Sequence, residues 1–152
     1  MATMDVEPEF IDTNVLVYAV LTSSPMYAQA MRALEEREKG GVELWISRQI
    51  MREFLSTLTR KSTLSSALPV STLATDLVAF QSRYRIAEDG PSVTDQLLIL
   101  LAAVPVGGKQ IHDANIVATM LAHGLNRLLT HNVADFRRFT PWIEVIPLVP
   151  TP

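Results

Sequence analysis

The chain has 152 residues, with 16 acidic and 13 basic side chains and a formal net charge of −3. This charge argues against nonspecific nucleic-acid binding by bulk attraction to phosphates, although it leaves room for a local site. A hydrophobic content of 48% indicates a globular protein. The sequence contains no cysteine, which excludes disulfides and thiolate metal sites.

The sequence gives no indication of a membrane protein. Its longest apolar block, residues 97–106, is too short to cross a bilayer. The acidic N-terminal segment lacks the basic and apolar regions of a signal peptide. We therefore expect a soluble cytoplasmic protein with no membrane partner. Residues 1–152 show no repeat or linker and predict a single domain, with residues 1–8 as a flexible N-terminal tail.

Strand-like and helix-like segments alternate along the chain. This alternation predicts an α/β domain with a mostly parallel central sheet, in which a site forms beyond the carboxyl ends of the strands. In chain order, the sequence predicts a strand at 8–13, a helix at 26–41, a strand at 42–47, helices at 48–61 and 70–84, a strand at 85–89, helices at 92–104 and 112–124, a strand at 125–130, a short helix at 133–139 and a strand at 143–149.

Three polar residues interrupt the first apolar run at the exit of the first strand. Asp12, Thr13 and Asn14 stand between Ile11 and Val15, where burial without partners would be costly. The position favours two interpretations of Asp12 equally. It either caps a following helix, as Asp often does, or belongs to a functional site.

Two further acids lie on predicted helices. Glu53 falls on the flank of the apolar face of helix 48–61, a position typical of a solvated charge. Asp113 is in line with Val117 and Met120 on the apolar arc of its helix. A first-turn Asp suits the helix dipole, but an acid aimed at the core needs a partner.

Asn132 and Asp135 follow the strand at 125–130 and match a capping arrangement, with Asn132 as the cap and Asp135 in the first turn. Since Asp12, Asn132 and Asp135 all follow strands, they should share one edge of the sheet, which Asp113 can also face. Carboxylates crowded at one edge repel each other unless a cation lies between them. Oxygen ligands favour Mg²⁺ or Mn²⁺ over zinc.

Four segments in this order, FIDTNVLVYA, REFLSTLTR, IHDANIVATMLAHG and LLTHNVADFRRF, resemble the PIN-domain ribonucleases. The resemblance is greatest to the VapC-type toxins of toxin–antitoxin pairs. It implies a PIN-like three-layer sandwich with helices on both faces of the sheet. It also implies a metal-dependent endoribonuclease that hydrolyses RNA with metal-activated water, a cognate antitoxin partner and a homodimer.

The resemblance also implies roles for individual residues. Asp12, Glu53 and Asp113 match the three principal metal-binding acids of the family, and we expect Asp135 to join them in catalysis. The fourth acid of the family falls at Asn132 in this chain, with Asp135 close behind. The sequence leaves open which of the two fills the fourth position.

Other polar residues are candidates for supporting roles. Thr13 and Thr130 can orient a carboxylate or the attacking water, and Asn14 with Thr13 can fix the turn. Four arginines are candidates for RNA contact, and an ordinary solvated surface charge is an equally good interpretation of each. The candidates for RNA contact are Arg48, Arg52, Arg137 and Arg138.

Other functions fit the sequence less well. A haloacid dehalogenase-type phosphotransferase needs a second acid two residues after the first, where this chain has Asn14. A response-regulator receiver needs paired acids that the first strand lacks. The alternative that stays open is a PIN-like RNA-binding or protein-interaction module with weak or no catalysis, because Asn132 replaces an acid.

The sequence also predicts how partners bind. Helix 26–41 offers Met26, Tyr27 and Met31 as a surface for the homodimer, with core packing as the alternative role of these side chains. We expect an antitoxin to inhibit by placing an arginine among the acids, because a guanidinium can form two-pronged pairs with carboxylates.

Overall fold

The computed structural model describes residues 5–60 and 68–150. Residues 1–4 of the expected tail and Lys61 of the expected helix 48–61 lie outside this part. The strands pair in the order β3-β2-β1-β4-β5, and every pairing is parallel. The expected parallel sheet is confirmed. Its strands are β1 (Glu9–Ile11), β2 (Leu44–Ser47), β3 (Arg85–Ala87), β4 (Arg127–Thr130) and β5 (Glu144–Pro147).

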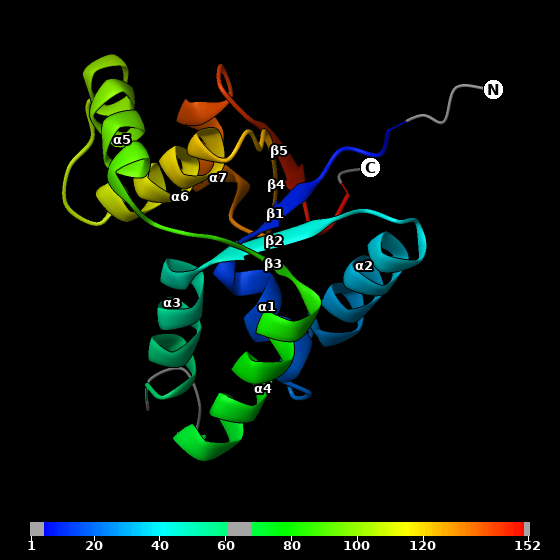
Figure 1. Ribbon diagram of the computed structural model, residues 1–152. Helices are drawn as coiled ribbons and strands as arrows, with labels where there is room; N and C mark the ends of the chain where they lie inside the picture. The colour runs from blue at the N-terminus through cyan, green and yellow to red at the C-terminus, as the bar shows by residue number, and fades with distance from the viewer. Residues whose placement is uncertain (1–4, 61–67, 151–152) are drawn as a thin grey trace.

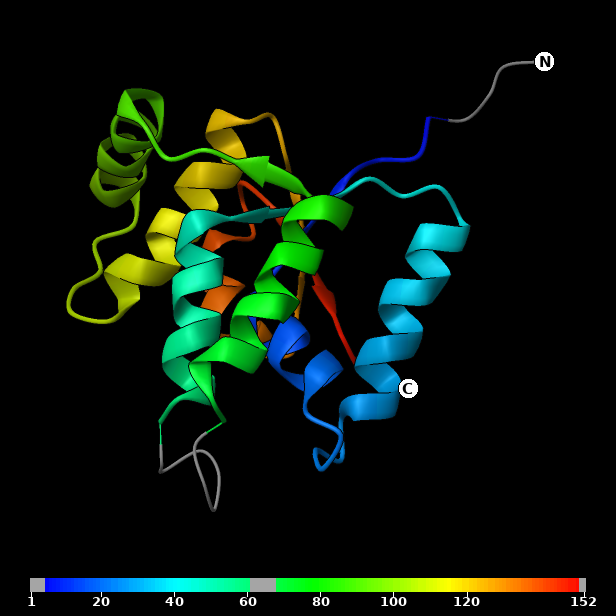
Figure 2. The same cartoon turned by 60° about the horizontal axis from the view of Figure 1, so that its bottom comes forward.

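Helices cover both faces of the sheet (Figures 1 and 2), so the expected three-layer architecture is confirmed. The chain runs outward from β1 to β3 with α1–α4 on one face. It then returns to β4 and β5 with α5–α7 on the other, as right-handed crossovers require. No helix in residues 5–60 and 68–150 is long and apolar enough to span a membrane. The helices are α1 (Thr13–Val20), α2 (Tyr27–Lys39), α3 (Arg48–Leu58), α4 (Val70–Arg83), α5 (Pro91–Ala103), α6 (Gln110–Ala122), α7 (Val133–Phe136) and the 3₁₀ helix η1 (Arg137–Phe139).

The sequence prediction did not include helix α1. This helix begins at Thr13, so Asp12 alone separates it from β1. The Asp12 carboxylate accepts a hydrogen bond from the Thr13 backbone N–H at 2.8 Å and caps the helix. The apolar run that follows Asn14 therefore continues as a buried helix. Its residues Val15 and Leu16 lie in the core.

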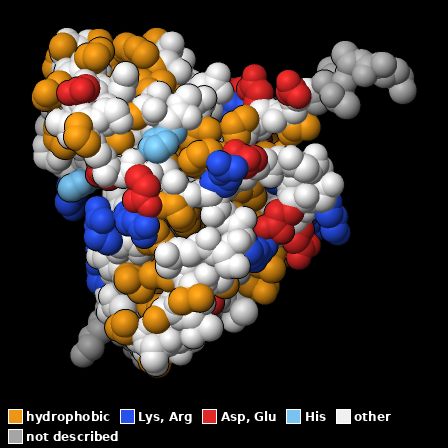
Figure 3. All heavy atoms as spheres, in the orientation of Figure 1, with side chains coloured by type: hydrophobic (Ala, Val, Ile, Leu, Met, Phe, Trp, Pro, Cys, Tyr) orange, Lys and Arg blue, Asp and Glu red, His pale blue; other side chains and the backbone are white. Residues whose placement is uncertain are grey.

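Met26, which caps α2, and Met31 are half-buried and pack in part against the hydrophobic core, so the alternative role of core packing applies to them in part. The core is built on fully buried residues of the central strands and their helices, such as Phe10, Ile46 and Phe54. Apolar side chains instead gather on the surface over α5 (Figure 3), where Leu98 and Ile99 are 62% and 63% exposed.

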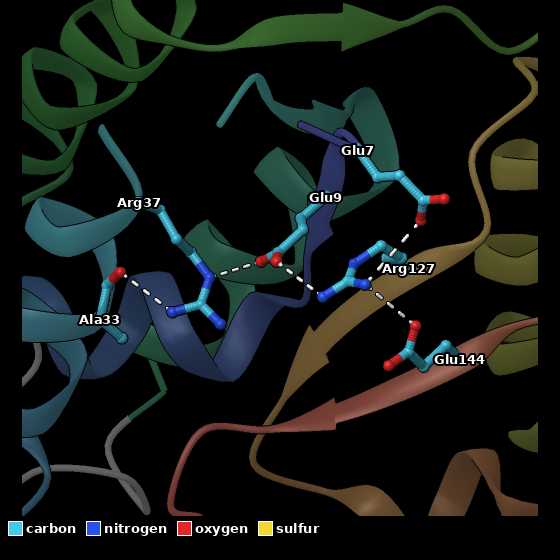
Figure 4. Close-up of polar contacts among 6 residues, drawn as sticks. All are labelled: Glu7, Glu9, Ala33, Arg37, Arg127 and Glu144. Atoms are coloured by element: carbon cyan, nitrogen blue, oxygen red, sulfur yellow. Dashed lines mark hydrogen bonds and ion pairs between the residues drawn. The ribbon is translucent and has the colours of Figure 1, made fainter. Parts of the chain in front are cut away.

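A network of ion pairs ties the amino-terminal edge of the sheet together (Figure 4). Glu9 on β1 is buried and accepts from Arg37 of α2. Its other oxygen lies 3.4 Å from Arg127 of β4, which also pairs with Glu144 of β5 at 3.1 Å. Arg127 lies 3.8 Å from Glu7 as well, so part of the expected N-terminal tail contacts the sheet.

Candidate active site

The four predicted acids line one open cavity of about 650 Å³. The cavity lies beyond the carboxyl ends of β1 and β4, where the strand order reverses, and this is the usual place of a site in a parallel sheet. Asp12 enters it from the β1–α1 corner, Glu53 from α3, Asp113 from α6 and Asp135 from α7. Four segments far apart in sequence thus bring their carboxylates together.

Asp12 is buried but fully hydrogen-bonded. One carboxylate oxygen accepts from the Thr13 backbone, and the other accepts from the Thr130 hydroxyl at 2.7 Å and the Asn14 amide at 3.1 Å. The pKa of Asp12 is raised to about 6, mainly by burial. The negative charge of Glu53 adds to the rise, and the three hydrogen-bond donors oppose it. The polar interruption of the first apolar run is therefore satisfied within the protein.

Asn14 and Thr130 join the β1–α1 corner to the loop after β4. The Asn14 side chain accepts from the His131 backbone N–H at 3.0 Å, in addition to its bond with Asp12. The buried Thr130 hydroxyl donates to Asp12 and accepts from the Asn132 backbone N–H at 3.0 Å. The two residues hold Asp12 and the loop as one unit.

Glu53 is held at both oxygens by neutral donors. The Thr13 hydroxyl donates to one oxygen at 2.7 Å, and the Gln49 amide donates to the other at 2.9 Å. Thr13 therefore orients a carboxylate, which is one of the roles predicted for it from the sequence. Glu53 is therefore an oriented member of the site and not the solvated flank charge that helical periodicity favours.

Asp113 is a half-buried acid whose carboxylate has no described partner. No group in residues 5–60 and 68–150 donates a hydrogen bond to its carboxylate or pairs with it. Its pKa is raised to about 6, first by burial and then by the charges of Asp135, Asp12 and Glu53, against an opposite effect of Arg138. A half-buried carboxylate surrounded by like charges is in the position that a bound cation stabilises.

Asn132 is the N-cap residue of α7 and Asp135 lies in its first turn, as the sequence predicts, but the Asn132 side chain makes no capping hydrogen bond. Asn132 and Asp135 both line the cavity, and Asp135 is the charge with the largest effect on the pKa of Asp113. Both candidates for the fourth acidic position of the site therefore lie beside the other acids.

The donor set of the cavity fits a hard divalent cation, because its polar side chains offer oxygen and include neither thiolate nor imidazole. Within the described residues, no three acidic or histidine side chains already stand close enough to form a finished metal site. Burial is the main cause of the raised pKa values of Asp12 and Asp113, the charges of neighbouring acids add to it, and a cation would favour the charged forms against both effects. The cavity therefore suits a divalent cation by the chemistry of its oxygen ligands and by its negative charge.

Comparison with known proteins identifies the family. A family model of the PIN domain matches residues 10–140. The chain belongs to the PIN domain family. The ribonuclease VapC48 of Mycobacterium tuberculosis is 26% identical over 133 residues, which cover 86% of this chain and 91% of that protein.

Solved structures share the PIN fold. VapBC2 from Rickettsia felis, bound to a DNA fragment from their promoter, has a TM-score of 0.68 at 20% identity, over 91% of this chain and 97% of that chain. A toxin–antitoxin complex from Klebsiella pneumoniae has a TM-score of 0.63 at 19% identity, over 94% and 99% of the two chains.

The arginines predicted to contact RNA do not line the cavity of this PIN domain. Arg48 forms a two-pronged pair with Glu88 at 2.7 and 3.0 Å, and Arg52 is exposed on α3 outside the cavity. Arg137 and Arg138 line a separate hollow beside residues 104–106. Arg48 is thus paired with Glu88 on the surface, and RNA contact by these four arginines stays a prediction.

Sequence reasoning missed two residues of the site. Arg60 lines the cavity and is the one basic residue among the described residues that does so. Its sequence signal is its position seven residues after Glu53, on the same face of the helix expected at 48–61, although α3 ends at Leu58. Gln49 is buried beside Glu53, and it stands one turn before that acid on the same helix. A glutamine in the first turn of a helix carries no sequence signal of burial.

Proposed function

We propose that this PIN domain is a metal-dependent endoribonuclease and the toxin of a toxin–antitoxin pair. The observation that carries the proposal is the convergence of four carboxylates on one open cavity, with Asp113 unsupported by any described donor. The ribonuclease VapC48 resembles the chain over most of both sequences, which supports the choice of RNA as substrate.

The residues of the cavity suit phosphodiester hydrolysis without a nucleophilic side chain. Asp12, Glu53 and Asp113 would hold Mg²⁺ or Mn²⁺, and Asp135 or Asn132 would complete the set. The cation supplies a water of lowered pKa and neutralises charge that develops on the phosphate. Thr130 and Asn14 fix Asp12, while Thr13 fixes Glu53. Arg60 offers a positive charge to an RNA phosphate on the α3 side of the cavity.

The proposed partner is a cognate antitoxin. The Klebsiella relative is a toxin–antitoxin complex with the same fold, which supports this choice. The crowded acids have no described basic partner within hydrogen-bonding distance, so an arginine from another chain would satisfy them and exclude the cation. A partner that binds tightly yet leaves the acids accessible and the nuclease active would contradict this mode of inhibition.

The homodimer stays a prediction. Met26 and Met31 are half-buried, whereas α5 carries Leu98 and Ile99 fully on the surface, so α5 offers a second apolar surface for a partner copy. Light scattering at high protein concentration tests it, and a strictly monomeric mass would contradict it.

RNA cleavage with and without divalent cation tests the proposed function. We expect the purified protein to cut structured RNA in Mg²⁺ or Mn²⁺ and to be inactive in excess chelator. Asp12→Asn keeps the size of the side chain and an acceptor for Thr13 but removes the charge, so cleavage should fall by at least about 100-fold. A wild type that binds RNA without cutting it in any divalent cation would favour the non-catalytic module.

A further inference from the structure

A buried glutamine connects two of the helices that carry the acids. Gln49 lies in the first turn of α3 and is 8% exposed. Its amide donates to Glu53 at 2.9 Å and to the His112 backbone carbonyl at 2.9 Å, while its oxygen accepts from Asn115 at 2.8 Å. Both N–H donors and the oxygen of one side chain are therefore engaged.

These bonds act on Glu53 and on the turn that bears Asp113. Glu53 is held between Gln49 and Thr13, so its carboxylate plane is fixed from two sides. His112 and Asn115 flank Asp113 in the first turn of α6, so the same amide also holds that turn against α3. A change at Gln49 would move two acids relative to one another.

We propose that Gln49 is the positioning residue of this site, because its amide fixes the Glu53 carboxylate and seats the α6 turn that carries Asp113. Gln49 is buried behind Glu53 and does not line the cavity, so it would act through these two acids and not on RNA. The inference rests on the proposed function, because the geometry matters only where the acids bind a cation. Groups that orient metal-binding side chains typically affect metal affinity or activity by about 10-fold to 100-fold.

The alternative is that Gln49 only stabilises the contact between α3 and α6. A control variant on the same helix separates the two roles. Ser47 caps α3 through its side chain, which accepts from the Ile50 backbone N–H at 3.3 Å and has no described hydrogen bond with the acids. Ser47→Ala therefore weakens the same end of α3 without changing the support of Glu53.

The experiment compares wild type, Gln49→Met and Ser47→Ala by thermal unfolding, Mn²⁺ calorimetry and RNA cleavage. Methionine keeps the length of the side chain and removes its donors. For Gln49→Met we expect about a 10-fold weaker Mn²⁺ affinity, about a 10-fold lower kcat and an unchanged KM. Ser47→Ala should lower the unfolding temperature while its affinity and kcat stay at the wild-type values.

Equal affinity and kcat in the two variants, at comparable unfolding temperatures, would overturn the positioning role alone. A wild type that neither binds Mn²⁺ nor cuts RNA would overturn the proposed function and this inference with it. If Gln49→Met does not fold, Gln49→Leu makes the same comparison, because it adds no charge and cannot donate to Glu53 or to the His112 carbonyl.

Discussion

At the scale of single residues, Asp12 combines burial with charge. Its pKa of about 6 in the folded protein lies above the ordinary value of 3.8, mainly because of burial. The folded state therefore binds more protons than the unfolded chain between about pH 4 and about pH 6. Metal-free protein should lose stability as the pH rises through this window, because the carboxylate must become charged without water around it.

Thermal unfolding in chelator at several pH values tests this prediction, with Asp12→Asn as the matched control. The unfolding temperature of the wild type, relative to that of the variant, should fall between pH 4 and pH 7. Mg²⁺, which we propose binds the charged carboxylates, should raise the wild-type unfolding temperature more at pH 7 than at pH 5. A wild type that gains stability relative to Asp12→Asn as the pH rises would contradict the account.

Asn132 and Asp135 offer a second test at this scale. Both line the cavity, and Asp135 is close enough to raise the pKa of Asp113. Asn132→Asp adds a charge and should tighten Mn²⁺ binding, whereas Asp135→Asn removes one and should weaken binding or slow cleavage. Calorimetry of the wild type should show one tight site. Two equally tight sites, or no change in either variant, would show that the fourth position is elsewhere.

Arg60 should contribute to RNA binding. Its charge lines the cavity, whereas the charge of Arg48 is already paired with Glu88. Arg60→Gln should raise KM about fivefold with little change in kcat, which corresponds to about 1 kcal/mol for an exposed charge pair. Arg48→Gln should leave KM near the wild-type value. The reverse ranking of the two variants in steady-state cleavage would contradict this assignment.

At the scale of elements, the amino-terminal edge of the sheet contributes stability and not chemistry. Glu9 joins α2 to β1 and β4 through Arg37 and Arg127 at the edge opposite the cavity. Glu9→Gln should lower the free energy of unfolding by about 2 kcal/mol, the scale of a hydrogen bond to a charged group. Denaturant unfolding measures this loss, and kcat should not change. A loss of kcat in the fully folded variant would contradict the separation of the two edges.

The sequence predicted much at this scale because strand exits are readable from it. Asp12 and Asp135 follow apolar runs, and parallel strands place such residues at one edge. Helix α1 was missed because one residue separates it from β1, which leaves no turn signal between two apolar runs. The sequence could not predict the ion pair of Arg48 with Glu88 or the burial of Gln49. Both depend on partners 40 or more residues away in the chain.

At the scale of the whole molecule, two edges of one parallel sheet have different tasks. Ion pairs join the strands and α2 at the amino-terminal edge, and repelling carboxylates converge at the carboxyl-terminal edge. The fold places the acids on the first strand's corner and on helices from both faces, so the cavity exists only in the assembled sheet. We propose that water activated at these acids cuts RNA.

The chemistry of the cleaved ends tests this claim most directly. Cleavage in ¹⁸O-labelled water with Mg²⁺ should place one ¹⁸O in a terminal phosphate monoester, because water attacks the phosphorus, and the reaction should stop in chelator. A 2′,3′-cyclic phosphate end, or cleavage that continues at full rate in chelator, would show that the 2′-hydroxyl is the nucleophile or that the metal is dispensable.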